Sequence, residues 1–429
     1  MKTPHWLLTA ALLALSARGA EAPAPEVQWL RARALPFDPA TDHARDLRPL
    51  KAALADARVV VLGEPTHGDG TSFTAKTRLV KFLHQHMGFS VLAFESGGFS
   101  ADQAWQQLAA GAEAAPVLAH STMPLWTQAR QCQPLLGYLA AQARGRRPLR
   151  FTGFDCRDDG PLAQQQLLPA FHRFLAAEKL AFADTAELGR FNRYFAALSG
   201  PPTPTPDPAR SAYLRRHAAD FRALLAGKLA QLAGRPGEPA EYWRQTWQTT
   251  LAYLPGLLRR RGAGELSGPA VSQLRDSLLA ENLVWLLTRR FPRQKIIVWT
   301  TNYHAAHRRA SRHADDQVQV MGDYLAPRLG RQLYTVGFTA GQGEWGLSTQ
   351  PGQVTALPPA AAGSFEDWCR QAGLSTALVP LRSTGAPEQA FSMRPLGYQA
   401  QQRRWAEVFD AVVYTATMEP ARPLTGGSQ

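Results

Sequence analysis

A short β-branched run at residues 59–62 is the feature that most limits how this chain can fold. Four apolar residues in a row, Val-Val-Val-Leu, predict a strand that is buried on both faces, because a half-exposed strand would alternate apolar and polar residues. Gly63 ends the run, and Glu64 and His67 follow it. In open α/β sheets, ligands bind beyond the carboxyl ends of the strands. The run therefore predicts an α/β fold with an acid and a base at the tip of one strand.

Further apolar runs of this kind alternate with segments of helical periodicity. Strand-like runs occur at 90–94, 149–154, 295–300, 333–338 and 410–415, and helical patterns occur at 73–87 and 125–143. Strands that alternate with helices at these lengths are typical of a parallel sheet with helices on its faces. We expect an α/β fold with a mostly parallel central sheet flanked by helices.

The pattern changes between residues 160 and 292, where helical periodicity continues and strand-like runs are missing. The expected helices cover about 161–178, 184–198, 208–232, 238–260 and 268–290, with a Pro-rich linker at 200–206 and a loop at 255–268. A Pro-rich stretch at 355–363 predicts another surface loop. We expect an all-helical insertion, residues 160–292, that forms one wall of a cleft. It would divide the α/β catalytic domain into residues 23–159 and 293–429.

The first 22 residues have the organisation of a signal peptide. Lys2 gives a charged start, residues 6–16 are apolar, and Ala20-Glu21-Ala22 fits the small-x-small cleavage rule. The apolar stretch is shorter than the roughly 20 residues that span a bilayer, which favours cleavage over a membrane anchor. No later stretch is long and apolar enough to span a membrane. We expect a periplasmic or secreted protein.

Charge and cysteine content narrow the partners. The formal net charge is +13, but the arginines are scattered among acids and form no aromatic-interleaved patch, so we expect no nucleic-acid partner. There are three cysteines, Cys132, Cys156 and Cys369, none in a CxxC spacing. This odd number leaves at least one thiol free and permits one disulfide whose pairing stays open. The sequence leaves the oligomeric state open.

Each predicted strand of the first half, and the one at 295–300, is followed by a polar residue. Glu95 follows 90–94, Asp155 follows 149–154, and Asn302 and His304 follow 295–300. Because the carboxyl ends of parallel strands lie along one edge, these residues should gather with Glu64 and His67. An imidazole held by a carboxylate can take a proton from water. The group therefore predicts acid–base chemistry.

The chain resembles the erythromycin esterase family in an ordered set of motifs, which together span about residues 45 to 415. The matching pieces are Gly63-Glu64-Pro65-Thr66-His67-Gly68, Lys76, Gly88-Phe89, Phe94-Glu95, Gly153-Phe154-Asp155, Arg275-Asp276, residues 282–287, Val298-Trp299, Asn302-Tyr303-His304 and residues 321–325.

The resemblance implies hydrolysis of a carboxylic ester, which in the resistance members is the lactone of a macrolide. Carried over by position, His67 would activate water, Glu64 and Glu95 would flank it, and His304 would face them as a further catalytic residue. Lys76 and Arg275 would bind the substrate. The chain departs from the family pattern at Thr301, where many members have a histidine, and at Thr71, where many have a glutamate.

Two other readings stay open. Glu64, His67, Glu95 and His304 form an oxygen and nitrogen set that zinc or manganese accepts, so a metal-dependent hydrolase is one alternative to a cofactor-free enzyme. A non-enzymatic ligand-binding protein of the cell envelope is the other. Serine hydrolysis is disfavoured because the chain has no Gly-x-Ser-x-Gly elbow. The expected partner is a small-molecule ester or lactone.

Overall fold

The computed structural model describes residues 23–158, 160–200, 205–307 and 318–424. The predicted signal peptide, residues 1–22, and residues 201–204 of the predicted Pro-rich linker lie outside these ranges. Within them, no helix combines the length and the apolar character that crossing a membrane requires.

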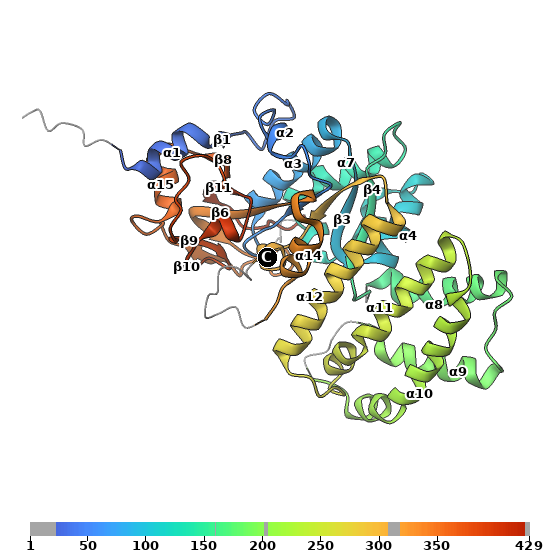
Figure 1. Cartoon of the computed structure of the whole chain (residues 1–429). Helices are drawn as coiled ribbons and strands as arrows, with labels where there is room; N and C mark the ends of the chain where they lie inside the picture. Colours follow the sequence, from blue (N-terminus) through green and yellow to red (C-terminus); the bar gives the residue numbers. More distant parts are fainter. Residues whose placement is uncertain (1–22, 159, 201–204, 308–317, 425–429) are drawn as a thin grey trace, which may run out of the picture.

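A mostly parallel sheet forms the centre of the molecule (Figure 1), which confirms the predicted fold class. Its strands lie in the order β1-β8-β11-β6-β2-β5-β3-β4, and β7 pairs with β6. Pairing is parallel from β11 to β4 and antiparallel at β8, β1 and β7. The strands are β1 (Leu35–Pro36), β2 (Val59–Leu62), β3 (Phe89–Gly97), β4 (Arg150–Asp155), β5 (Lys295–Trp299), β6 (Leu333–Trp345), β7 (Thr355–Leu357), β8 (Thr376–Pro380) and β11 (Ala411–Met418).

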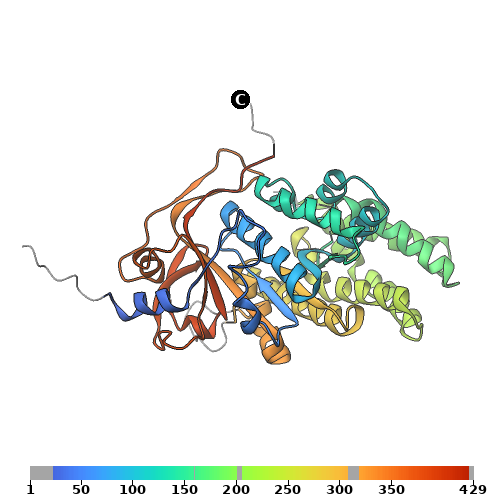
Figure 2. The same cartoon turned by 90° about the horizontal axis from the view of Figure 1, so that it is seen from above.

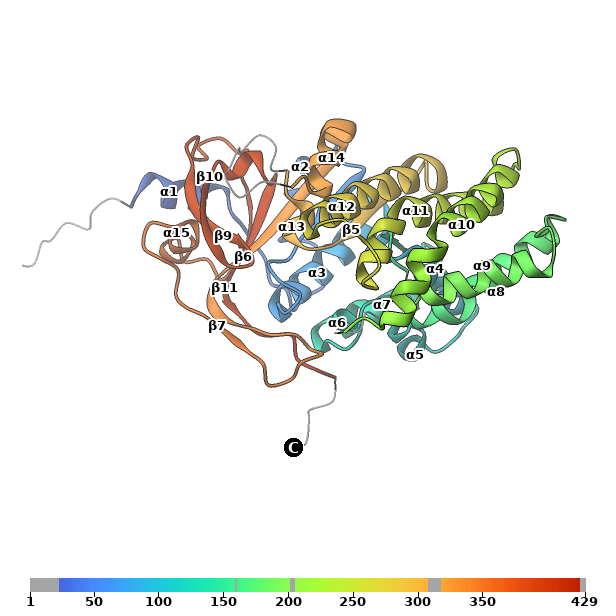
Figure 3. The same ribbon diagram turned by 90° about the horizontal axis from the view of Figure 1, so that it is seen from below.

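Helices cover both faces of this sheet, so the central strands need apolar residues at every position. In β2, Val60 and Leu62 pack into the core of one face, and Val59 and Val61 pack into the core of the other. The first face carries α3 (Gly70–Met87), α4 (Gly98–Ala109) and α7 (Gln133–Ala143), and the second carries α12 (Gly268–Trp285), α14 (Met321–Leu329) and α15 (Phe365–Gln371). Figure 3 shows α3 and α12 over the middle of the sheet.

The helical block predicted after residue 160 is present as α8 (Pro161–Ala177), α9 (Thr185–Leu198), α10 (Pro208–Ala233) and α11 (Glu238–Arg260), with α12 leading back to the sheet. These helices have an aromatic core of their own around Phe171, Phe191 and Trp247. In Figure 2 they extend away from the sheet on the side opposite to the C-terminal strands. The bounds of an insertion at 160–292 stay a prediction.

Several local predictions were wrong. Pro255 lies inside α11 rather than in a loop, because the buried residues Tyr253, Leu254 and Leu258 hold this part of the helix against its neighbours. The helix expected at 125–143 is broken into α6 (Pro124–Thr127), a short 3-10 turn and α7, with Pro134 in the first turn of α7. The loop at 355–363 begins with β7.

All three cysteines are buried and free, so none forms the disulfide that the sequence permitted.

Candidate active site

The strand order brings the predicted rim residues together. β5 lies between β2 and β3, and β4 follows β3. Glu64 follows β2, Glu95 lies near the end of β3, and Asp155 is the last residue of β4. His304 lies on α13 (Asn302–Ala305), directly after β5. Segments that are distant in sequence therefore meet at one edge of the sheet.

His67 and Glu64 form a carboxylate–imidazole pair. His67 Nδ1 lies 2.9 Å from Glu64 Oε1, and the His67 side chain is 28% exposed whereas that of Glu64 has no exposed surface. Burial alone would lower the pKa of His67, but the hydrogen bond and the charge of Glu64 outweigh it and raise the pKa above its ordinary value of 6.5. The carboxylate thus fixes the ring and increases its basicity. Among the described residues, Nε2 of His67 has no hydrogen-bond partner.

The buried side chains of Lys76 and Trp126 donate hydrogen bonds to Glu64 and hold it in place. Lys76 Nζ donates to Glu64 Oε2 at 2.6 Å and to the Thr300 carbonyl at 3.1 Å, and Trp126 Nε1 donates to Glu64 Oε1 at 3.2 Å. Lys76 has no exposed surface, and burial lowers its pKa even though Glu64 opposes the effect. This geometry favours a positioning role for Lys76 over the direct substrate contact that the resemblance implied.

Close backbone packing requires the first glycine of this loop. A Cβ on Gly63 would lie 2.1 Å from Asn302 Oδ1. Asn302 in turn donates from Nδ2 to the carbonyls of Phe338 and Pro395, and its backbone N–H donates to the Glu64 carbonyl at 2.8 Å. The strand tips of β2 and β5 are therefore locked to each other beneath the site.

A second charged cluster contains Glu95, Arg275 and His304. Arg275 Nη2 donates to Glu95 Oε1 at 2.7 Å and to Asp155 Oδ2 at 2.6 Å, and Arg275 Nη1 lies 2.9 Å from His304 Nε2. Thr300 Oγ1 donates to the other Glu95 oxygen at 2.6 Å. Burial would raise the pKa of Glu95, but His304 and Arg275 hold it well below its usual range. Glu95 therefore stays ionised.

His304 is held by a carboxylate of its own. Its Nδ1 lies 2.6 Å from Asp276 Oδ1, which also accepts from the Met321 N–H at 2.8 Å. Burial opposes a charge on His304, but Glu95 and Asp276 raise its pKa to about 9. When Nε2 is protonated it can donate to Glu95 Oε1 at 3.3 Å, and when it is not, it accepts from Arg275. His304 can thus exchange a proton without moving.

Asp155 extends this cluster toward the helical block. Burial would raise the pKa of Asp155, but Arg157 and Arg275 together lower it, so it remains a carboxylate. It accepts from Arg157 Nη2 at 2.8 Å as well as from Arg275. Arg275 therefore lies between two buried carboxylates and an imidazole.

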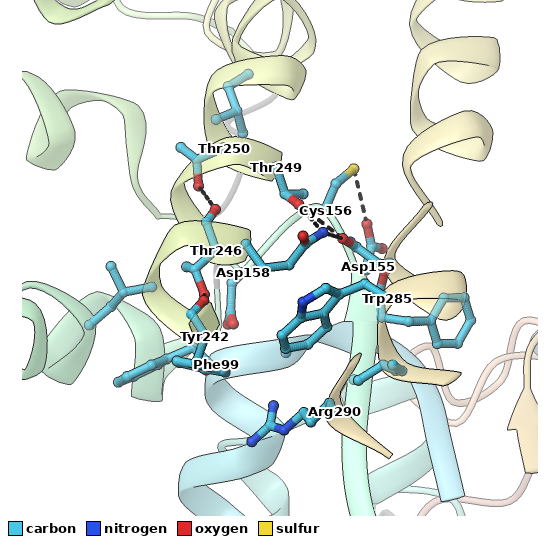
Figure 4. Close-up of a pocket in the computed structure, with 18 of the residues that line it drawn as sticks. Phe99, Asp155, Cys156, Asp158, Tyr242, Thr246, Thr249, Thr250, Trp285 and Arg290 are labelled. Carbon is cyan, nitrogen blue, oxygen red and sulfur yellow. Dashed lines mark hydrogen bonds between the residues drawn. The ribbon is translucent and has the colours of Figure 1, made fainter. Parts of the chain in front are cut away.

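Two cavities adjoin the cluster. A cavity of about 370 Å³ is lined by Glu95, Asp155 and Arg157, together with residues 121–124. A smaller one, of about 100 Å³, shares Asp155 with it and lies between α11, α12 and β4. Figure 4 shows the smaller cavity among Tyr242, Thr249, Trp285, Asp155 and Cys156, with Arg290 below. We take the larger cavity as the candidate substrate space, because it reaches Glu95. His67, Arg275 and His304 do not line it, so a substrate held there would have to extend past Glu95 to meet His67.

The structure brings all six predicted site residues to this edge, and Lys76, which has no exposed surface, contacts Glu64 from within the core. Sequence reasoning assigned no site role to Trp126, Asp276 or Thr300. It named Asp155 as a strand-tip carboxylate and as part of the Gly153-Phe154-Asp155 motif, also without a role. Asp276 lies next to Arg275 in sequence, and Thr300 is the last residue of a predicted strand, so position alone would have been the signal. Nothing local marks Trp126. In the described part of the chain, no three His, Cys, Asp or Glu side chains are arranged to hold a metal ion.

A model of the family described as erythromycin esterase matches residues 84–418. The chain belongs to the erythromycin esterase family. This membership indicates a hydrolase. The matched range includes Glu95, Arg275 and His304, whereas the loop that carries Glu64 and His67 precedes it.

Several proteins of known sequence or structure are also similar to most of the chain. "Putative hydrolase YbfO" of Bacillus subtilis (strain 168) is 26% identical over 92% of this chain and 91% of its own, and Erythromycin esterase type II of Escherichia coli is 22% identical over 74% and 77%. A solved succinoglycan biosynthesis protein has a TM-score of 0.73 at 21% identity, covering 92% of this chain and 97% of its own. A mutant of the erythromycin esterase EreC in its open conformation has a TM-score of 0.69 at 17% identity, covering 92% and 99%. The solved structures show the fold alone.

The two departures from the erythromycin esterase pattern have structural roles in this chain. Thr301 caps α13, where its Oγ1 accepts from the His304 N–H at 3.5 Å. Thr71 Oγ1 accepts from the Glu419 N–H at 2.9 Å and ties the start of α3 to the C-terminal segment. Both threonines therefore fix backbone near the site.

Proposed function

We propose that this protein is an exported hydrolase that cleaves a carboxylic ester or lactone with water activated by His67. The proposal rests on the surroundings of the His67 imidazole. Its Nδ1 is held by the buried Glu64 side chain, and its pKa is raised. Its Nε2 makes no hydrogen bond to any of the described residues. Export rests on the N-terminal sequence pattern.

In this mechanism, His67 Nε2 accepts a proton from water as the water oxygen attacks the ester carbonyl carbon. Glu64 stabilises the imidazolium that forms, and Lys76 and Trp126 keep Glu64 in place. The tetrahedral intermediate collapses with cleavage of the carbon–oxygen ester bond, and the alkoxide leaving group takes a proton back from the imidazolium. Water and ester are consumed, and an acid and an alcohol are formed.

The cationic groups opposite His67 supply the electrostatic stabilisation that this reaction needs. Arg275 and His304 lie within hydrogen-bond distance of each other and of Glu95. Their positive charge favours the oxyanion of the intermediate. Glu95 holds both groups in place and also raises the pKa of His67 by its charge.

The contacts of the carboxylates favour this reading over a metal-dependent one. Both oxygens of Glu64 accept hydrogen bonds, from Lys76, His67 and Trp126. The oxygens of Glu95 accept from Arg275 and Thr300. A divalent cation would have to displace these donors. Exhaustive chelation that abolishes turnover, with recovery on adding zinc or manganese, would support the metal-dependent alternative instead.

The pH dependence of kcat/KM should be bell-shaped. His67 must be neutral to act as a base, and its pKa is raised above 6.5, so activity should rise through an apparent pKa above 6.5. The cationic form of His304 should be lost above about 9, where activity should fall. Glu64→Gln removes the negative charge that helps to raise the pKa of His67, so the acid limb of this variant should move to lower pH. An acid limb below pH 6.5 in the unmodified protein would contradict this assignment.

Substrate class is tested by turnover of p-nitrophenyl acetate, of simple γ- and δ-lactones, and of erythromycin. We expect hydrolysis of at least one ester or lactone. For erythromycin the product would gain the mass of one water, and the His67→Ala variant serves as the control for spontaneous opening. No mass gain at high enzyme concentration would remove the macrolide as a substrate. Saturable binding of these compounds without any product would favour a binding protein.

A further inference from the structure

A tyrosine occupies an unfavourable backbone conformation at a hairpin close to the loop that carries Glu64 and His67. The hairpin consists of β9 (Phe391–Leu396) and β10 (Gln399–Arg403), and its turn contains Gly397 with φ of 61° and Tyr398 with φ of 59°. Two successive residues with positive φ are typical of a type I′ turn, where glycine and asparagine are preferred. A bulky residue in this region is an outlier that calls for a reason.

In this conformation the Tyr398 side chain reaches a buried carboxylate, Asp69, close to His67. Its hydroxyl donates to Asp69 Oδ1 at 2.8 Å, and Asp69 has no exposed surface. The other Asp69 oxygen accepts from the Thr66 N–H at 2.5 Å. Thr66 Oγ1 accepts in turn from the Gly68 N–H at 3.0 Å. The chain of hydrogen bonds from Tyr398 therefore ends on the two residues that flank His67.

The backbone of the same loop is anchored to the C-terminal part of the chain. The Gly68 carbonyl accepts from the N–H groups of Ala421 at 2.9 Å and Gly346 at 3.2 Å, and the Gly70 N–H donates to the Glu419 carbonyl at 2.9 Å. A Cβ on Gly68 would lie 2.8 Å from the backbone of Gly346. These bonds hold the loop after His67, whereas Tyr398 and Asp69 also hold it before His67.

We propose that Tyr398 is a positioning residue that fixes His67 through Asp69 and Thr66. The inference rests on the proposed function in that it names His67 as the base. Without the phenol hydroxyl, Asp69 Oδ1 loses its donor, and Asp69 holds Thr66 less firmly, although Gly68 and Gly70 stay anchored to the C-terminal segment. The distance between His67 Nε2 and the reacting carbon would then vary more, and displacements of about 1 Å can cost as much as 10²-fold in rate.

The test compares Tyr398→Phe with Tyr194→Phe as the matched control. Tyr194 is a buried tyrosine of the helical block whose hydroxyl donates to the Leu214 carbonyl at 3.0 Å, so its variant also loses one hydroxyl hydrogen bond, but far from the loop in sequence and fold. Tyr398→Phe should lower kcat about tenfold with KM within about twofold, whereas Tyr194→Phe should leave both unchanged. Asp69→Asn should lower kcat as well, and the double variant should lose little more than either single one.

A second measurement does not depend on turnover. In ¹⁵N-labelled protein, the His67 ring resonances and their titration should change in Tyr398→Phe and stay as in the unmodified protein in Tyr194→Phe. Unchanged kcat and an unchanged His67 titration in Tyr398→Phe would overturn the proposal, as would equal kcat losses in both phenylalanine variants. If the unmodified protein hydrolyses no ester, the proposed function fails, and the His67 titration alone then decides whether Tyr398 positions the ring.

Discussion

Replacing His67 by alanine should reduce kcat by at least ~10²-fold while the protein stays folded, because positioned proton transfer contributes about 10² to 10⁴ in rate. The His67 side chain is 28% exposed and its main partner is Glu64, so its removal leaves no large cavity in the core. The measurement is steady-state turnover of an ester substrate, together with a thermal unfolding curve that shows a folded variant.

His217→Ala is the matched control for this variant. His217 also has a carboxylate three residues away, Asp220, at 3.6 Å, and its side chain is 38% exposed. It lies on α10 in the helical block. We expect unchanged kcat in this variant. Near-normal turnover in His67→Ala would show that the catalytic base lies elsewhere, whatever the control does.

The second large effect concerns stability as well as rate. Arg275→Leu should lower the free energy of unfolding by about 3–5 kcal/mol, the usual cost of removing one partner from a buried ion pair. Arg275 is 12% exposed and binds both Glu95 and Asp155, whose side chains are 2% and 3% exposed. Because Arg275 also contacts His304, kcat should fall by at least ~10²-fold if these cations stabilise the oxyanion.

Arg157→Leu separates these two effects. Arg157 binds Asp155 but is 25% exposed, and Asp155 would retain Arg275 as a partner. We therefore expect a smaller loss of stability, measured by urea unfolding. Because Arg157 lines the candidate substrate space, KM should rise, whereas kcat should fall much less than in Arg275→Leu. If Arg275→Leu is as stable as the unmodified protein, the buried cluster does not hold the strand tips together as described here.

The sequence predicted which strands and residues form this site better than it predicted which of them contact one another. The apolar runs that became β2, β3, β4, β5, β6 and β11 were evident because strands buried on both faces need continuous apolar residues. β9 and β10 were missed because Ser, Arg and Pro interrupt the apolar residues of Phe-Ser-Met-Arg-Pro-Leu, and because Gln-Ala-Gln-Gln-Arg is almost entirely polar. These strands contribute the turn that carries Tyr398 and, through the Pro395 carbonyl, an acceptor for Asn302.

Strand order was beyond sequence reasoning, and the site depends on it. Local patterns could not show that β5 lies between β2 and β3, so they could place Glu64 and Glu95 on one edge but not fix their spacing. The burial of Lys76 was hidden for a related reason: helical periodicity puts it on α3, but only the assembled sheet puts Glu64 and Trp299 against it. Pairing of Asp276 with His304 likewise requires α12 to pack beside α13.

The position of β5 also determines when the site comes into existence. β2 and β3 are joined by a single helix, yet each pairs in the finished sheet with β5, which the chain reaches only after the whole helical block. Pairing between strands so far apart in sequence is slow, because the chain loses the entropy of the closed loop before the strand contacts form and offset that loss. A chain that has folded only as far as α11 holds His67, the proposed base, without Arg275 or His304. On the proposed mechanism, turnover requires the fold to extend at least as far as His304, and a population folded only as far as α11 would be silent in an activity assay.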